Sequence, residues 1–225
     1  MNRNSLLPAL TGGLVVAIAG TAAQASVIVI NDTIHWLGGA PVGSVVTENL
    51  AGPTTISSLG FHRFTVTSAG SVTIDILSFE IRPNTQVVDV NGDGESAFID
   101  SVIYLFQDDG TPNGGLFLGP YNDDSGILGT DGSVNGRDSR IERNLPAGNY
   151  LLVIGAYDYG FNEINAGVNT SAASFGPYRW TGSQMVVADH GDYRITITGN
   201  VTPTPGAAAL MGLGGLALTR RRRNK

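Results

Sequence analysis

Two short apolar runs constrain the fold of this chain more than any other feature of its sequence. They cover residues 101–107 and 150–157, and each has the length and composition of a buried β-strand. The segment between them is acidic and rich in Gly. We therefore expect two buried strands joined by an acidic crossover of long turns, with one short strand near residues 116–118.

Three other runs alternate apolar and polar residues, which is typical of strands with one buried face. The first two, residues 62–67 and 72–76, are joined by Ser68-Ala69-Gly70 and are predicted to form an antiparallel hairpin. The third run covers residues 193–198, and a first strand is expected at residues 27–30. No long stretch has the 3.6-residue period of a helix, so the sequence predicts an all-β domain.

The charge of the chain is unevenly distributed. All 19 acidic residues lie between Asp32 and Asp192, whereas six of the 13 basic residues lie near the two ends. Subtracting those six leaves seven Arg against 19 acids, a net charge of −12 for the central region. Such a domain repels nucleic acid and anionic lipid and attracts divalent cations. The absence of Cys from the sequence excludes disulfides, Cys-ligated metals and a thiol nucleophile.

The first 25 residues have the composition of a secretory signal peptide. Arg3 precedes a largely apolar stretch at residues 6–19, and the small residues Ala23 and Ala25 fit the rule for cleavage by signal peptidase before Ser26. An uncleaved membrane anchor is the alternative. We expect removal of residues 1–25 and a single domain over residues 26–201.

Residues 202–225 contain three features in a fixed order. Pro203-Thr204-Pro205 comes first, an apolar run follows at residues 207–218, and the cluster Arg220, Arg221, Arg222 and Arg223 comes near the end. The apolar run is shorter than the roughly 20 residues that a membrane-spanning helix needs. A tail-anchored span and an unfolded tail are the alternatives to a sorting signal.

This tail resembles the PEP-CTERM sorting signal of Gram-negative bacteria, with Pro203-Thr204-Pro205 in place of Pro-Glu-Pro. The resemblance implies a membrane-inserted precursor, associated with the membrane through both ends. It also implies removal of the tail by an exosortase-type protease and delivery to the cell surface or the extracellular matrix.

A second resemblance covers residues 61–198. Asp100-Ser101-Val102-Ile103-Tyr104-Leu105-Phe106, Asn122-Asp123-Asp124-Ser125-Gly126, Asp138-Ser139-Arg140-Ile141 and Leu145-Pro146-Ala147-Gly148-Asn149-Tyr150 are similar to motifs of pre-peptidase C-terminal (PPC) domains. This resemblance implies an antiparallel, jelly-roll-like β-sandwich with an accessory role and no reaction of its own.

The sharpest local motif is a candidate calcium loop. Asp89, Asn91, Asp93, Gly94 and Asp100 match positions 1, 3, 5, 6 and 12 of an EF-hand loop, and Glu95 offers a further carbonyl oxygen. The segment after Asp100 is predicted to be a strand, however, and not the helix that an EF-hand requires. A solvated turn is therefore the alternative to a Ca²⁺ site.

A second acidic cluster lies in the crossover. Asp and Asn in Gly-rich loops mostly form turns by bonding their own backbone, although carboxylates are also ligands for hard cations. The cluster comprises Asp108, Asp109, Asp123, Asp124 and Asp138.

Catalytic readings find little support in the sequence. His35, His62 and His190 are scattered without metal-ligand spacing, and no Gly-x-Ser-x-Gly motif occurs. We therefore expect a non-enzymatic protein. A carbohydrate-binding module is the alternative, in which Tyr178 and Trp180 stack on an extracellular polysaccharide, and these aromatic residues otherwise hold residues 158–190 against the core. A hydrolase with two convergent carboxylates is the third reading.

Overall fold

Two antiparallel strands that are buried on both faces form the centre of one sheet. They are β7 (Ser101–Asp108) and β10 (Gly148–Ala156), which pair from Ser101↔Ala156 to Gln107↔Tyr150. Their continuous apolar sequences follow from this position, because neither face of either strand is left to solvent over most of its length. Both buried strands predicted from the sequence are therefore confirmed.

The computed structural model describes residues 25–46, 54–79, 89–91, 94–111, 113–119, 121–125, 136–174 and 176–204. Ala23, Asp93, Pro205 and the cluster Arg220–Arg223 lie outside these residues, so the cleavage site and sorting tail are not described in full. No helix among the described residues is long and apolar enough to cross a membrane.

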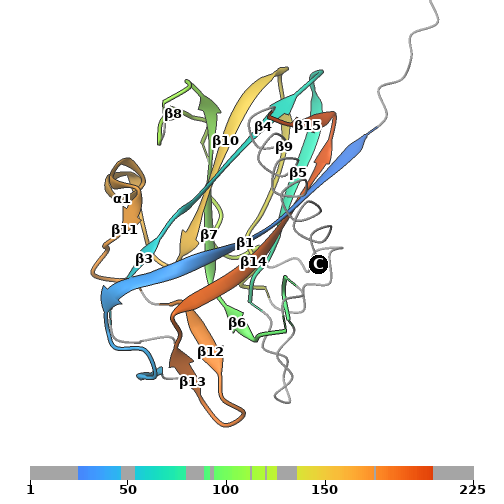
Figure 1. Ribbon diagram of the computed structural model, residues 1–225. Coiled ribbons are helices and arrows are strands. Elements are labelled where there is room, and N and C mark those ends of the chain that lie inside the picture. Colours follow the sequence, from blue (N-terminus) through green and yellow to red (C-terminus); the bar gives the residue numbers. More distant parts are fainter. Residues whose placement is uncertain are drawn as a thin grey trace, which may run out of the picture.

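Two sheets face each other across the molecule (Figure 1). The smaller sheet has the order β15-β4-β10-β7-β8, and its remaining strands are β4 (Gly60–Val66), β8 (Gly115–Phe117) and β15 (Val201–Pro203). The larger sheet is built around β1 (Ser26–Gly39), β14 (His190–Gly199), β5 (Gly70–Leu77) and β9 (Arg140–Leu145). The prediction of an all-β sandwich is confirmed.

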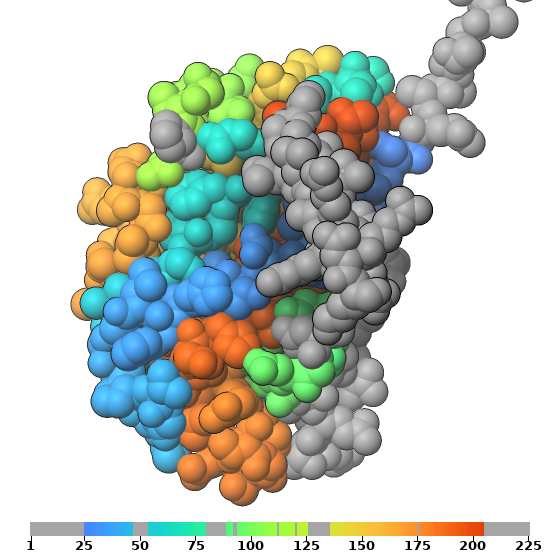
Figure 2. Space-filling view, in the orientation of Figure 1, coloured from blue at the N-terminus to red at the C-terminus, as the bar shows by residue number. Residues whose placement is uncertain are grey.

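Short strands extend the larger sheet on both sides of the β1–β14 pair. Figure 2 shows β1 crossing one face of the molecule, with the β12–β13 hairpin protruding beyond it. The short elements are β2 (Val45–Val46), β3 (Thr55–Ser58), β6 (Ala97–Phe98), β11 (Val168–Asn169), β12 (Tyr178–Trp180) and β13 (Met185–Val187). The described part of residues 158–190, expected to be irregular, therefore contains three short strands and the helix α1 (Phe161–Ala166).

Three apolar clusters stabilise this arrangement. The largest lies between the sheets and takes inward-facing residues from both, such as Ile74 and Ile195 from one sheet and Ile103 and Leu152 from the other. A second cluster covers the outer face of the smaller sheet, where Tyr159 and helix α1 pack on β7 and β10. A third, around Phe98 and Tyr178, packs together side chains of the short strands β6, β12 and β13.

The predicted hairpin of residues 62–67 and 72–76 is wrong, although both strands exist. β4 pairs with β10 and β15, whereas β5 pairs with β14 and β9, so the two strands belong to different sheets. Residues 67–69 carry the chain from one sheet to the other. Each sheet turns one face to the shared core, and an alternating strand fits equally well in either sheet.

Both ends of the sandwich domain lie at the same end of the molecule. Ser26 begins β1 and pairs with Gly199 at the end of β14, and Val201 of β15 follows directly and pairs with Val66. β7 and β10 extend from this end to the opposite one, where Ser101 pairs with Ala156 (Figure 1).

Truncating a side chain on the outer face of β10 tests whether that face is covered. Val153 is fully buried there, so we expect Val153→Ala to lower the free energy of unfolding by about 2 kcal/mol. The matched change Val29→Ala removes the same atoms from a side chain that is 55% exposed and should cost less than about 1 kcal/mol. Equal losses in urea unfolding would contradict a covered outer face.

Candidate metal centre

Asp100 is a buried acid at the point where β7 begins. The residue is 3% exposed, and its carbonyl oxygen accepts a hydrogen bond of 2.9 Å from the backbone N–H of Tyr157. That bond fixes the backbone next to the first pair of the β7–β10 ladder. The side chain of Asp100 is therefore held in place at the end of the smaller sheet.

The crossover loop brings two more acids to Asp100. Asn122 forms a backbone bridge with Ile103 of β7, with N–O distances of 2.8 and 3.1 Å. Ser139 Oγ lies 2.9 Å from the carbonyl oxygen of Asp123 and 2.6 Å from that of Ser101. These contacts place Asp123 and Asp124 beside the start of β7.

The three acids form one group. One carboxylate oxygen from each of Asp100, Asp123 and Asp124 lies within 4.8 Å of the others. Arg137 Nη1 lies 3.1 Å from Asp100 Oδ2, and its guanidinium carbon lies 5.4 Å from the centre of the Phe79 ring. Asp100 Oδ1, in contrast, is enclosed and has no hydrogen-bond partner among the described residues.

Burial and repulsion from neighbouring carboxylates make Asp100 and Asp123 reluctant to ionise. Burial raises the pKa of Asp100 to about 7, Arg137 opposes the rise, and Asp123 and Asp124 add to it. Burial also raises the pKa of Asp123 to about 6, with further contributions from the neighbouring charges of Asp124 and Asp158. A bound cation would favour the ionised form of each carboxylate, and so the group has the electrostatics of a cation site.

The site joins residues that the sequence placed in two separate candidates. Asp100 belongs to the predicted calcium loop, and Asp123 and Asp124 belong to the second acidic cluster. Sequence reasoning missed Arg137 altogether, and no spacing in the sequence indicates the bridge between Asn122 and Ile103. The conjunction depends on strand pairing between residues that are far apart in the chain.

Apart from Asp100, the described acids of the predicted loop, Asp89 and Glu95, line a separate pocket. Asp89 Oδ2 accepts a hydrogen bond of 2.8 Å from the Gly94 N–H, and Glu95 Oε2 lies 2.9 Å from His190 Nε2. Both acids line a pocket of about 510 Å³, together with Ser96, Ala97, Arg179 and Asp189 among other residues. Asp93 is not described, so a Ca²⁺ site made by Asp89, Asn91, Asp93, Glu95 and Asp100 stays a prediction.

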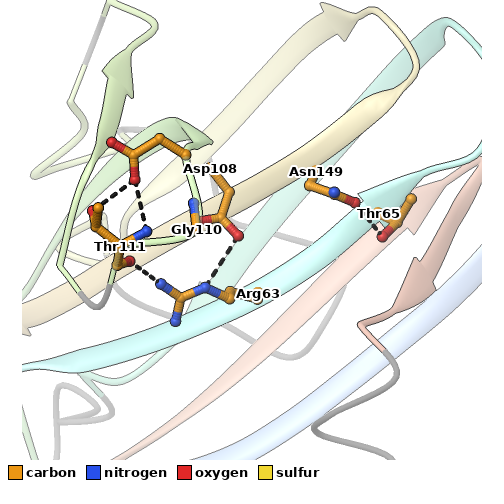
Figure 3. A network of polar contacts seen from close by, with 7 residues as sticks. Arg63, Thr65, Asp108, Gly110, Thr111 and Asn149 are labelled. Carbon is orange, nitrogen blue, oxygen red and sulfur yellow. Dashed lines mark hydrogen bonds and ion pairs between the residues drawn. The ribbon is translucent and has the colours of Figure 1, made fainter.

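The other acids of the second cluster have local structural roles. Figure 3 shows Asp108 next to Arg63, with Oδ2 and Nε 3.1 Å apart. Asp109 Oδ1 accepts hydrogen bonds from the N–H and hydroxyl of Thr111. Asp138 Oδ1 accepts three, from the Ser78 N–H, the Ser78 hydroxyl and the Phe79 N–H, at 2.8 to 2.9 Å.

The aromatic candidates for sugar stacking lie on one strand but differ in exposure. Tyr178 is fully buried, and its ring centre lies 5.6 Å from that of Phe98. Trp180 is partly buried against the same apolar cluster. A buried ring offers no face to a sugar, so Tyr178 has the packing role here. The alternative of sugar stacking stays a prediction for Trp180.

His62 packs against Tyr193 of β14. Its Nε2 lies 2.8 Å from the hydroxyl of Tyr193, and burial lowers its pKa. His190 contacts two carboxylates, with Nδ1 2.9 Å from Asp189 Oδ1 and Nε2 2.9 Å from Glu95 Oε2.

Comparisons with known proteins add little to this picture. No family model matches the sequence, and no curated protein matches it. Among solved structures, the chain is similar to the pre-peptidase C-terminal domain of collagenase from Bacillus anthracis, at 13% identity over 76% of this chain and 87% of that chain. The TM-score is 0.31, which is too low to support an argument, so the fold assignment rests on the strands themselves.

The raised pKa of Asp100 predicts an unusual pH dependence in the presence of a chelator. The folded-state pKa of about 7 lies above the ordinary value of 3.8, so this group contributes stability below about pH 4. This contribution to the free energy of unfolding, at most on the order of 4 kcal/mol, is lost as the pH rises from about 4 through about 7.

Urea unfolding of wild type and Asp100→Asn between pH 4 and 8 measures this contribution as the difference between the two proteins. We expect wild type to lose stability relative to the variant as the pH rises. Asp109→Asn is the matched control, because Asp109 is exposed. Parallel curves for wild type and Asp100→Asn would show that Asp100 ionises without penalty.

Proposed function

We propose that this chain is an exported bacterial surface protein whose β-sandwich has a binding or structural role and no catalytic one, and whose fold is stabilised by calcium. In this proposal, signal peptidase removes residues 1–25, an exosortase-type protease removes the C-terminal tail, and the sandwich remains at the cell surface or in the extracellular matrix.

The observation that supports this proposal is the agreement between strand boundaries and processing signals. The first strand begins at Ser26, directly after the small residues that fit the cleavage rule. The last strand ends at Pro203, the first residue of the Pro-Thr-Pro motif. Cuts before Ser26 and after Pro203 would therefore leave every described strand of the sandwich intact.

Contacts at these boundaries give each end a structural role. The Val201 N–H donates to Ser26 Oγ at 3.2 Å, and the Ser26 hydroxyl also lies close to the carbonyl oxygens of Gly199 and Val201. Pro203 is paired with Phe64 of β4. A cut within β1 or β15 would remove residues that pair with β14 or β4. The folded domain therefore favours cuts before Ser26 and after Pro203.

The spatial relation of the two ends agrees with an attached precursor. Ser26 and Gly199 face each other in the β1–β14 ladder, so both terminal segments leave from one end of the sandwich. A precursor held in the membrane through both segments could therefore keep its folded domain on one side of the membrane. The net charge of −12 would separate such a domain from anionic lipid.

Intact-mass measurement of surface-released protein tests the proposal. We expect a chain that begins at Ser26, ends after Pro203 and lacks the apolar run and the Arg cluster. Changing Arg220, Arg221, Arg222 and Arg223 together to Gln should leave the tail on the protein and keep it with the cell membrane fraction.

Lys225→Gln is the matched control, because it removes a positive charge outside the Arg cluster and should be processed as wild type. Recovery of released wild-type protein that still carries Arg220–Arg223 would contradict the sorting role of the tail.

A further inference from the structure

We infer that Asp100, Asp123 and Asp124 together bind one calcium ion at the end of the sandwich opposite Ser26 and Val201. The inference deepens the calcium part of the proposed function, on which it rests, and assigns the ion to a site that the linear calcium motif does not describe.

The distances within the group suit a single ion. Calcium binds oxygen at 2.3–2.6 Å, so two oxygens of one coordination sphere lie at most about 5.2 Å apart. The three carboxylate oxygens lie within 4.8 Å of one another. Each pair of these oxygens is therefore close enough to share one ion.

The environment of Asp100 is an independent indication that a cation binds here. Its side chain is 5% exposed, and Oδ1 is shielded from solvent and has no hydrogen-bond donor in the part of the chain that the structure describes. Buried polar atoms without partners are rare and costly in folded proteins. Asp138 shows how the same fold treats a structural buried acid, since its Oδ1 collects three donors. Asp100 Oδ1, on a carboxylate of the acidic group, has no such donor among the described residues.

The charge of the group also calls for a cation. The group has three carboxylates and one neighbouring guanidinium, that of Arg137 beside Asp100, which leaves an excess of two negative charges when all three acids are ionised. Asp158 adds to the negative potential at Asp123. A divalent ion neutralises the excess, whereas a monovalent ion does so only in part.

The type of donor favours calcium over other divalent metals. The group offers carboxylate oxygens alone, and hard oxygen ligands suit calcium and magnesium, whereas zinc prefers nitrogen and sulfur. Magnesium requires near-ideal octahedral geometry, and calcium accepts irregular sets of six to eight oxygens. A site made by a strand start and a separate loop, with one partly exposed side, fits calcium better. Water and backbone oxygens would complete the coordination.

The ion would fasten the acidic crossover to the core. Asp100 is fixed to the β7–β10 pair, while Asp123 and Asp124 belong to the loop after β8. Without an ion, repulsion between the carboxylates opposes this contact. With an ion, the same charges stabilise it.

Thermal melting of the purified protein in calcium and in chelator, at fixed ionic strength, tests the site. Calcium should raise the melting temperature of wild type by several degrees, and titration calorimetry should show one strong site per chain. Asp123→Asn and Asp124→Asn should each weaken calcium binding by at least about tenfold and remove most of the shift. In chelator, both variants should melt at or above wild type, because repulsion is reduced.

Two matched controls locate the ion. Asp89→Asn removes a ligand of the linear motif, and Asp109→Asn removes an exposed acid at the other end of β7. Both variants should keep the full calcium shift. Asp124 is exposed, so a failure to fold does not obscure its result.

Each contrary result has a definite meaning. A shift lost in Asp89→Asn but kept in Asp123→Asn and Asp124→Asn would overturn this site and leave calcium stabilisation standing. No calcium-specific shift in wild type, or an equal shift with magnesium, would overturn the calcium assignment. Neither result changes the masses that test export and processing.

Discussion

The structure depends on the burial of both faces of the β7–β10 pair. Burial of the inner face joins the two sheets, and burial of the outer face requires a cover that a simple sandwich does not have. The segment after β10 supplies that cover, since the hydroxyl of Tyr159 donates toward the carbonyl oxygen of Val102, at 2.9 Å, and Ile164 of α1 packs on the same surface. The apolar sequence of the two strands and the course of residues 157–166 thus have one cause.

The acidic end of the molecule follows from the same pair of strands. Asp100 is buried because it precedes a strand that is itself buried, and the crossover must return to that strand through Asn122. The fold therefore gathers like charges where water is scarce. Asp138 meets this condition with three hydrogen bonds, and Asp100 meets it only in part through Arg137. The difference between two buried acids in one region distinguishes a structural carboxylate from a candidate ligand.

Local patterns in the sequence indicate the strands well and their partners poorly. The run at residues 150–157 is buried as its composition predicts, and residues 193–198 alternate in burial as their pattern requires. The alternating run at residues 72–76 reveals one buried face, yet it contains nothing that selects β14 over β4 as a neighbour. The metal candidates show the same limit, because Asp100 and Asp123 meet through pairing between distant segments. Spacing within one loop could not reveal that contact.

The first and last long strands of the sandwich meet where Ser26 pairs with Gly199, and this pairing has a mechanical consequence. Hydrogen bonds in an antiparallel ladder run perpendicular to the strands. A force that draws Ser26 away from Gly199 would therefore break the β1–β14 ladder one pair at a time, starting at the surface. A load applied to the opposite end, roughly 26 Å away along β7, would instead be shared among several strands before any pair separates. The sandwich therefore opens readily under force at the end that contains Ser26 and Gly199. It resists force at the end that contains Asp100.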